Sequence, residues 1–386
     1  MAFSWEQRKA KELFVSTADK GYPELPVLSA TQDRGMIRRD ENSINIFHDK
    51  ENEAGYKRVL PGQFVIHLRS FQGGFAHSKI EGITSPAYTV FGFYELENHD
   101  SEYWKYVFTS KSFIRRLETV TYGIRDGRNI SYDEFLTLNF VYPPKAEQMA
   151  IARYLDKLSN LIALHQRKLD RLKNIKKSML DKMFPKDGEV VPEIRFKGFT
   201  DAWEQRKLGD IGTITTGSTP STSIPDYYSD DGIIWVTPTD ISENITFKSA
   251  RKLSELGQQV GRVVPKNTIL VTCIASIGKN TMLGNTGSFN QQINGLTPNE
   301  NKYEPYFLLI ESEIWSAQMR KSAAAGTMQI INRTEFSGLE TWIPKLNEQK
   351  VIGTYFRNLD NLITLHQRKL DKLKNIKKSM LDNMFV

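Results

Sequence analysis

Two nearly identical stretches decide how this chain folds: HQRKLDRLKNIKKSMLDKMF at residues 165–184 and HQRKLDKLKNIKKSMLDNMF at residues 366–385. They lie 201 residues apart. When both are extended back to Tyr154 and Tyr355, the two segments are identical at 24 of 31 positions. A period of about 200 residues is far longer than that of a solenoid repeat. The repeat therefore predicts a duplicated domain.

The sequence around these stretches repeats as well. Residues 134–148 align with residues 335–349 at the same offset, and WEQRK occurs at Trp5–Lys9 and again at Trp203–Lys207. Between these anchors the halves diverge, although VLPGQFVIHLRS (59–70) faintly echoes VVPKNTILVTCI (263–274) at an offset of 204. We interpret the chain as two copies of one unit, each a variable region of about 130 residues followed by a nearly invariant basic segment.

The repeated segment is predicted to be a long helix. Pro144 and Pro344 stand where a helix can begin, and no Pro or Gly interrupts residues 148–184. Its apolar residues recur in steps of three and four, which is typical of a coiled-coil seam. The predicted seam is Leu155, Leu158, Ile162, Leu169, Leu172 and Ile175 in the first copy, and Phe356, Leu359, Ile363, Leu370, Leu373 and Ile376 in the second.

About 36 helical residues would make a rod of ~54 Å. Two such rods in one chain most simply pair antiparallel about a pseudo-twofold axis, with the unlike variable regions at opposite ends. His165 and His366 fall on the same seam. We interpret them as a polar pair that fixes the register of the coil, in preference to a metal site.

The variable regions contain short β-branched runs between Gly, Pro and Asn, with short helices expected at residues 103–117 and 306–321. The predicted fold class is two mixed α/β (α+β) domains with two long helices in an antiparallel coiled coil. The expected boundaries are domain 1 at 1–143, helix 1 at 144–184, a linker at 185–202, domain 2 at 203–343 and helix 2 at 344–386.

Composition restricts the class of protein. The net charge of +7 and the pI near 9.1 favour a polyanionic partner, and the charge is concentrated in residues 165–177 and 366–378, each with a net +5. No apolar run reaches the roughly 18 residues of a membrane span, and the start has no signal-peptide pattern. The single cysteine, Cys273, excludes an intramolecular disulfide. We therefore expect a cytoplasmic protein.

The motifs of nucleic-acid enzymes are missing. A GxxxxGK[ST] phosphate loop is absent, because Gly278-Lys279 has Cys273 in place of the first glycine and Asn280 in place of the Ser/Thr. No strand-GxGxxG-helix pattern appears, and Tyr142-Pro143-Pro144-Lys145 lacks the residues that flank the two prolines in amino-methyltransferases. We therefore predict no catalytic residue, no metal site and no cofactor in this chain.

With these features, the sequence resembles the specificity (S) subunit of type I restriction-modification systems over essentially its whole length. The motifs that carry the resemblance in the second half are VPEIRFKGFTDAWEQRKLGDI (191–211), TPSTSIPDYY (219–228), IIWVTPTDI (233–241), NQQINGL (290–296) and IPKLNEQKVIGTYFRNLDNLI (343–363). In the first half they are LPVLSATQDRG (25–35), EGITSPAYTV (81–90) and YPPKAEQMAIARYLDKL (142–158). One departure is the start, where MAFS precedes WEQRK without a counterpart of PEIRFKGF.

The resemblance implies that each variable region is a target recognition domain for one half of an asymmetric bipartite site on double-stranded DNA. The helices would set the spacer and dock two methyltransferase (M) subunits, followed by two restriction (R) subunits, with one S subunit per complex. It implies that S-adenosylmethionine, ATP and Mg²⁺ belong to those partners, and that this chain is a non-catalytic subunit.

Candidate DNA-binding residues are polar or basic residues on loops that can reach base edges or phosphates. In the first domain they are Gln32, Arg34, Arg69, Gln72, Lys79, Tyr122, Arg125 and Arg128. In the second they are Thr239, Arg251, Ser276, Lys279, Gln291, Gln292 and Gln329. For residues 290–294 a purely structural turn remains an alternative.

Two rival functions stay open. One is a fragment of a fused methyltransferase-nuclease, which would need the cofactor motifs that are missing. The other is a free-standing basic DNA-binding protein whose helices grip phosphates through residues such as Lys173, Lys176 and Lys177. The sequence does not reveal the half-sites or the spacer length.

Overall fold

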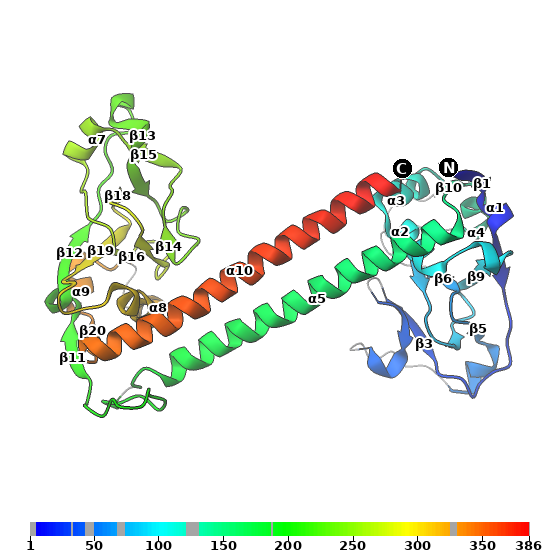
Figure 1. Cartoon of the computed structure of the whole chain (residues 1–386), viewed down its shortest axis with the longest axis horizontal. Helices are drawn as coiled ribbons and strands as arrows, with labels where there is room; N and C mark the ends of the chain where they lie inside the picture. Colours follow the sequence, from blue (N-terminus) through cyan, green and yellow to red (C-terminus); the bar gives the residue numbers. More distant parts are fainter. Residues whose placement is uncertain are drawn as a thin grey trace. The chain divides into compact units, whose positions relative to one another are not determined.

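The computed structural model describes residues 5–31, 34–42, 50–67, 74–120, 131–186, 188–324 and 330–385. It divides into two compact units, Met1–Gln166 with Arg368–Val386, and Arg167–Gln367. Each unit holds one mixed α/β domain and a part of each of two long helices (Figure 1). The predicted fold class is confirmed. The predicted domain boundaries differ from this division, because each compact unit draws on both helices.

The long helices are α5 (Lys145–Lys182) and α10 (Leu346–Met384). α5 begins directly after Pro144, whose carbonyl accepts hydrogen bonds from the backbone of Glu147 and Gln148, and it ends shortly before Pro185. α10 contains Gly353, a residue that weakens a helix interior. A Cβ at this position would collide with the Glu304 carboxylate, so the glycine allows α8 (Pro305–Ala324) to approach the helix closely.

Within each unit the two helices pack in opposite directions. In the first unit the beginning of α5 shares a core with the end of α10, where Leu155 and Leu158 lie in the same cluster as Phe385. In the second unit the end of α5, with Met183 and Phe184, shares a core with Phe356 near the beginning of α10. The packing of two long helices that the repeat predicted is confirmed.

None of the predicted seam residues is exposed. Six of them are buried and the other six are half-buried. The buried ones are Leu155, Leu158, Leu169, Phe356, Leu359 and Leu370; the half-buried ones are Ile162, Leu172, Ile175, Ile363, Leu373 and Ile376. His165 and His366 are half-buried as well.

The first domain begins and ends in an antiparallel ribbon of β1 (Glu6–Lys9) and β10 (Asn139–Tyr142). Its main sheet has the order β2 (Phe14–Thr17), β9 (Thr89–Phe93), β6 (Phe64–Ile66) and β7 (Phe75–His77). Two further pairs are β3 (Leu28–Thr31) with β4 (Gly35–Arg38), and β5 (Lys57–Val59) with β8 (Gly82–Thr84). The helices are α1 (Ala10–Leu13), η1 (Arg39–Glu41), η2 (Lys50–Gly55), η3 (Leu96–Asn98), α2 (Ser101–Thr109), α3 (Lys111–Val120) and α4 (Tyr132–Phe135).

The second domain repeats this plan, with a ribbon of β11 (Glu204–Lys207) and β20 (Glu340–Ile343). Its main sheet has the order β12 (Gly212–Thr216), β19 (Ile293–Pro298), β16 (Ile269–Thr272), β17 (Asn280–Leu283) and β14 (Ile245–Thr246). A second sheet has the order β15 (Arg251–Leu253), β13 (Tyr228–Val236) and β18 (Gly287–Phe289). The other helices are α6 (Leu208–Ile211), η4 (Pro225–Tyr227), α7 (Glu255–Val260) and α9 (Arg333–Gly338).

The faint echo between the two variable regions reflects a true equivalence, but its register differs by one residue. The backbone amide of Gly62 donates to the carbonyl of Ser78, and that of Asn267 donates to the carbonyl of Leu283, both at 2.8 Å. These equivalent bonds are 205 residues apart, not 204. Gly62 and Asn267 also share a left-handed backbone, with φ of 89° and 67°. The duplication thus extends through the divergent regions.

Candidate nucleic-acid interface

Polar loops of the second domain gather at one edge of its sheets. β12 ends, β19 begins, β16 ends and β17 begins at this edge, because the strands are antiparallel neighbours. The parallel strands β13 and β18 end there too, since the amide of Asn290 donates to the carbonyl of Val236 and that of Ser218 to the carbonyl of Phe289. We call loops 217–222, 237–240, 273–279 and 290–292 the polar edge.

Side chains of these loops hold one another in place. The hydroxyl of Thr219 donates to the side-chain oxygen of Gln291, which lies 72 residues away in the sequence. In loop 237–240, the Asp240 carboxylate accepts from the backbone amide and the hydroxyl of Thr237, at 2.8 and 2.6 Å. Thr239 Oγ1 lies 2.8 Å from Thr237 Oγ1 and is exposed. The loops are therefore braced while their tips stay accessible.

Loop 273–279 is closed by Thr272. Its hydroxyl accepts from the backbone amide of Lys279 at 2.9 Å and donates to the carbonyl of Ser276. The ammonium of Lys279 reaches the carbonyl of Pro238 at 3.3 Å, which connects this loop to loop 237–240. Ser276 and Lys279 are exposed. A cation and a hydroxyl thus stand beside Thr239 on the same edge.

The structure brings together most of the candidates predicted in the second domain. Thr239, Ser276, Lys279, Gln291 and Gln292 all lie on the polar edge. Arg251 stands next to it at the start of β15, paired with Trp235 near the end of β13, and its guanidinium lies 5.5 Å from the Tyr228 ring centre. Gln329 lies outside the described residues.

The alternative of a structural turn at residues 290–294 holds for part of that segment. Asn290 accepts from the amide of Gln292 at 3.1 Å, and Asn294 donates to the carbonyl of Ile331 at 3.1 Å. Both asparagines are buried. Gln291 is exposed and Gln292 is half-buried, so the asparagines shape the turn and Gln291 is presented to solvent.

Sequence reasoning missed Arg262, which borders the same edge. Its guanidinium donates to the carbonyl of Thr216 at 2.6 Å, and its backbone amide donates to the hydroxyl of Ser218 at 2.9 Å. The side chain is exposed. Its one sequence signal is an isolated arginine after a turn glycine, which is too common to single it out.

The first-domain candidates are more scattered. Arg34 is exposed in the turn between β3 and β4. β4 runs parallel to β7 through the Met36–Ser78 bridge, so this turn points toward the edge where β6 ends and β7 begins. That edge is equivalent to the polar edge. The remaining predictions, Gln32, Arg69, Gln72, Tyr122, Arg125 and Arg128, fall outside the described residues.

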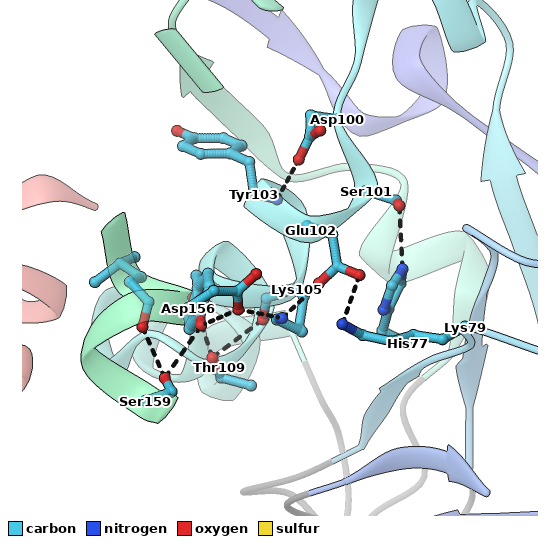
Figure 2. Close-up of polar contacts among 12 residues, drawn as sticks. His77, Lys79, Asp100, Ser101, Glu102, Tyr103, Lys105, Thr109, Asp156 and Ser159 are labelled. Atoms are coloured by element: carbon cyan, nitrogen blue, oxygen red, sulfur yellow. Dashed lines mark hydrogen bonds and ion pairs between the residues drawn. The ribbon is translucent and has the colours of Figure 1, made fainter. Parts of the chain in front are cut away.

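Lys79 lies at the opposite end of β7, in a chain of ion pairs. Its ammonium is 2.9 Å from Glu102, whose carboxylate also binds Lys105. Lys105 in turn lies 3.0 Å from Asp156 of α5, and Figure 2 shows this row of side chains. Burial opposes ionisation of Glu102, but the two ammonium groups lower its pKa. Lys79 thus belongs to the contacts between the domain and α5.

A metal site needs a cluster of ligating side chains, and the one cysteine in the described part of the chain is buried. Within it, no group of three or more His, Cys, Asp or Glu side chains is arranged to hold a metal ion. Cys273 is buried, and burial raises the pKa of its thiol to about 11, which disfavours a nucleophilic thiolate. No helix in the described ranges is both long and apolar enough to span a membrane.

The outer faces of the long helices carry a repeated apolar pair. Leu161 and Leu164 of α5 are 43% and 42% exposed, and Leu362 and Leu365 of α10 are 46% and 47% exposed. The two pairs are related by the 201-residue repeat. Each unit therefore presents one of two matching hydrophobic faces. We call them the helix faces.

Comparisons with known proteins agree with this architecture. Residues 200–375 match the family described as the type I restriction modification DNA specificity domain. The specificity subunit of type I restriction enzyme MjaIX from Methanocaldococcus jannaschii is 28% identical over 196 residues, which are 48% of this chain and 44% of that protein. The HindI specificity subunit from Haemophilus influenzae is 27% identical over 183 residues, 45% of this chain and 39% of that protein. Each match thus spans less than half of the relative.

Solved structures show the same fold over the full length. The S subunit of a type I restriction-modification system from M. genitalium has a TM-score of 0.66 at 14% identity, covering 100% of this chain and 97% of that one. The HsdS subunit from Thermoanaerobacter tengcongensis has a TM-score of 0.50 at 15% identity, with the same coverage. The likeness includes both domains and both long helices.

Proposed function

We propose that this chain, which carries a type I restriction-modification DNA specificity domain at residues 200–375, selects the DNA sequence on which a restriction-modification complex acts. The observation that carries the proposal is the polar edge. Five independently predicted side chains from loops far apart in the sequence meet there, on a scaffold that the chain contains twice.

The polar edge offers the groups that reading DNA requires. Gln291 can form a bidentate pair with adenine, while Thr239 and Ser276 can donate to or accept from base edges. Lys279, Arg251 and Arg262 supply cations for the phosphates that fix the register of the protein on the duplex. The loops of the two domains differ in sequence, so each domain reads a different half-site and the complete site is asymmetric and bipartite.

The helix faces support the assembly part of the proposal. Exposed leucine pairs such as Leu161 with Leu164 are the apolar patches that partner helices cover. Because the same pair recurs at Leu362 and Leu365, the chain can bind two copies of one partner in the same way. We assign these partners as two methyltransferase subunits, with two restriction subunits joining one specificity subunit in the cytoplasm.

In this proposal the chain has no catalytic role. Its partners bind S-adenosylmethionine, ATP and Mg²⁺ and carry out methylation and cleavage, while this chain supplies recognition and docking. The buried Cys273 and the engaged carboxylates of Asp240 and Glu102 leave these groups with structural roles.

A genome-wide map of methylated adenines tests the role in recognition. Comparison of cells with and without the gene should show that one asymmetric bipartite motif loses methylation while other motifs keep theirs. An unchanged map, with the partner methyltransferase confirmed as expressed, would contradict the proposal.

The rival free-standing binder is tested through the basic helix. Lys176 is a poor candidate for a phosphate contact, because it is 15% exposed and pairs with Glu313 at 2.8 Å and Asp360 at 2.9 Å. Lys173 and Lys177 are exposed, so the test reverses the charge of these two residues. The rival requires the salt slope of DNA binding to fall by about one unit per lost contact. We expect the Lys173→Glu and Lys177→Glu variants to keep the slope and to weaken methyltransferase docking.

A further inference from the structure

Loop 237–240 of the polar edge is built around one carboxylate. Asp240 Oδ2 accepts from the backbone N–H of Thr237 at 2.8 Å, and Asp240 Oδ1 accepts from the backbone N–H of Ala250 at 2.8 Å. A backbone N–H can only donate, and a carboxylate can only accept. Asp240 is therefore an acceptor on both of its oxygens, and it ties the loop to the residue just before β15.

A third bond to Asp240 fixes the direction of a hydrogen bond farther out. The hydroxyl of Thr237 lies 2.6 Å from Asp240 Oδ2 and donates to it. A hydroxyl has one proton, so Thr237 has none left for its other neighbour, Thr239 Oγ1 at 2.8 Å. In this second bond Thr239 must therefore donate and Thr237 accept. We call Asp240, Thr237 and Thr239 the hydroxyl relay.

The hydroxyl relay determines what Thr239 offers at the surface. Thr239 is exposed, whereas Thr237 and Asp240 are half-buried. In the described part of the chain, the bond to Thr237 is the one hydrogen bond of the Thr239 hydroxyl. Because its proton points inward to Thr237, its outward side carries lone pairs alone. Thr239 is thus a hydrogen-bond acceptor toward solvent, whereas a free threonine hydroxyl could also donate.

We propose that Asp240 sets the base preference of Thr239, so that this side chain binds the exocyclic amino group of an adenine or a cytosine in the major groove. Each base pair presents one amino group there, on adenine N6 or cytosine N4, and its other polar atoms are acceptors. This preference rests on the proposed function, which places the polar edge against DNA. Asp240 is a positioning residue, since it acts through Thr237 and Thr239.

The loop is held in place before any DNA binds. The bond from Ala250 joins it to the strand that begins at Arg251, and the ammonium of Lys279 reaches the carbonyl of Pro238 at 3.3 Å. Cations therefore stand near Thr239, and the phosphates that they bind hold a base edge beside its hydroxyl. Because the hydroxyl relay is already formed, the Thr239 hydroxyl needs no reorientation on binding, which lowers the ordering cost.

Thr237→Val tests the hydroxyl relay, and Thr237→Ser is its matched control. Valine has the shape of threonine without the hydroxyl, so the Thr239 proton is freed while both backbone bonds to Asp240 remain. In adenine methylation maps, Thr237→Val should make one position of one half-site also accept the reversed base pair. Serine keeps the hydroxyl, so the Thr237→Ser map should match the wild type. Thr239→Val identifies the position, because loss of its hydroxyl relaxes the choice of base there.

Base analogues test the chemical group with the wild-type chain. The probe is a duplex carrying the mapped motif, with the adenine of the Thr239 position replaced by purine or the cytosine by 2-pyrimidinone, which both lack the amino group. The complex of the chain with its methyltransferase should bind this duplex roughly two- to tenfold more weakly, the effect of one hydrogen bond. The Thr239→Val complex should lose little affinity on the same replacement, which separates the lost contact from changes in DNA pairing.

Three results overturn the proposal: Thr237→Val and Thr237→Ser give the same motif, Thr239→Val relaxes no position, or removal of the amino group weakens the wild-type and Thr239→Val complexes alike. If Thr237→Val does not fold, the analogue duplexes still decide, because they use the wild-type chain and a substitution at an exposed residue. The recognition role is judged separately, since it fails only if deletion of the gene leaves the methylation map unchanged.

Discussion

Glu311 shows how one residue can make stability depend on pH. Its carboxyl is buried in the second domain, where it accepts a hydrogen bond from Thr341, and the hydroxyl of Thr341 accepts from the indole of Trp315 at 2.9 Å. Burial raises the pKa of Glu311 to about 8 from its ordinary 4.5. The neutral form therefore fits the fold. The stability that the neutral Glu311 carboxyl contributes to the fold is fully present below pH ~4.5 and is lost as the pH rises through about 8.

Replacing this carboxyl by an amide should remove that dependence. Glu311→Gln keeps an acceptor for Thr341 and cannot ionise. Between pH 5 and 8 the wild-type chain should lose stability relative to the variant by up to ~1.4 kcal/mol per pH unit. Thermal unfolding of both chains at pH 5, 6.5 and 8 checks this. A constant difference across the three pH values would show that Glu311 does not titrate in this range.

A buried glutamine at the start of each long helix makes a second residue-scale prediction. Gln148 donates to the carbonyl of Pro143 at 2.8 Å and accepts from the amide of Asp100 at 2.9 Å. Gln349 makes the same two bonds, to Pro344 and from Glu304, at the same distances. Gln148→Leu should leave a buried amide and carbonyl without partners, at a cost of about 1–3 kcal/mol for each group.

Unfolding by urea checks the glutamine prediction. Gln259→Leu, the same change at an exposed position of α7, is the control and should shift the midpoint little. If both variants shifted the urea midpoint by the same amount, the two hydrogen bonds of Gln148 would contribute nothing to stability.

At the scale of the helices, the two repeats are alike in sequence but differ in how they hold a buried lysine. Lys176 of α5 lies between Asp360 and Glu313, and although burial opposes it these carboxylates raise its pKa. The equivalent residue of the other repeat, Lys377 of α10, donates to the hydroxyl of Ser159 at 2.8 Å, because Ser159 occupies the position that corresponds to Asp360. Burial and the nearby Lys105 lower the pKa of Lys377.

Matched substitutions distinguish these two environments. Lys176→Met should destabilise the chain by roughly 2–4 kcal/mol because it leaves two partly buried carboxylates without their cation. Lys377→Met should be close to neutral, since it removes a poorly compensated charge. Ser159→Asp should stabilise by giving Lys377 the partner that Lys176 has. Equal losses for the two methionine variants, measured by urea unfolding, would refute the difference.

At the scale of the whole molecule, the sequence predicted what depends on local pattern. Helix period and an exact 201-residue offset are visible in the sequence, so the long helices, their packing and the duplication could be predicted. Partners such as Thr219 with Gln291, or Lys176 with Glu313, come from loops and helices far apart in the chain. No local signal marks them. The sequence comparison placed the variable regions 204 residues apart, one less than the 205 of the structure, because a few identical residues align at 204.

The proposed division of labour, with one half-site read by each domain, leads to the last prediction. Gln291 lies on the polar edge of one domain, so Gln291→Ala should relax one half of the bipartite site and leave the other half unchanged. Loss of one bidentate base contact costs about 1–3 kcal/mol of discrimination at one base pair. In the proposed function Lys279 binds a phosphate, so Lys279→Ala should weaken methylation at the whole motif without changing its sequence. Adenine methylation maps of cells carrying each variant check both outcomes. If Gln291→Ala altered the bases read in both halves, the assignment of one half-site to each domain would be wrong.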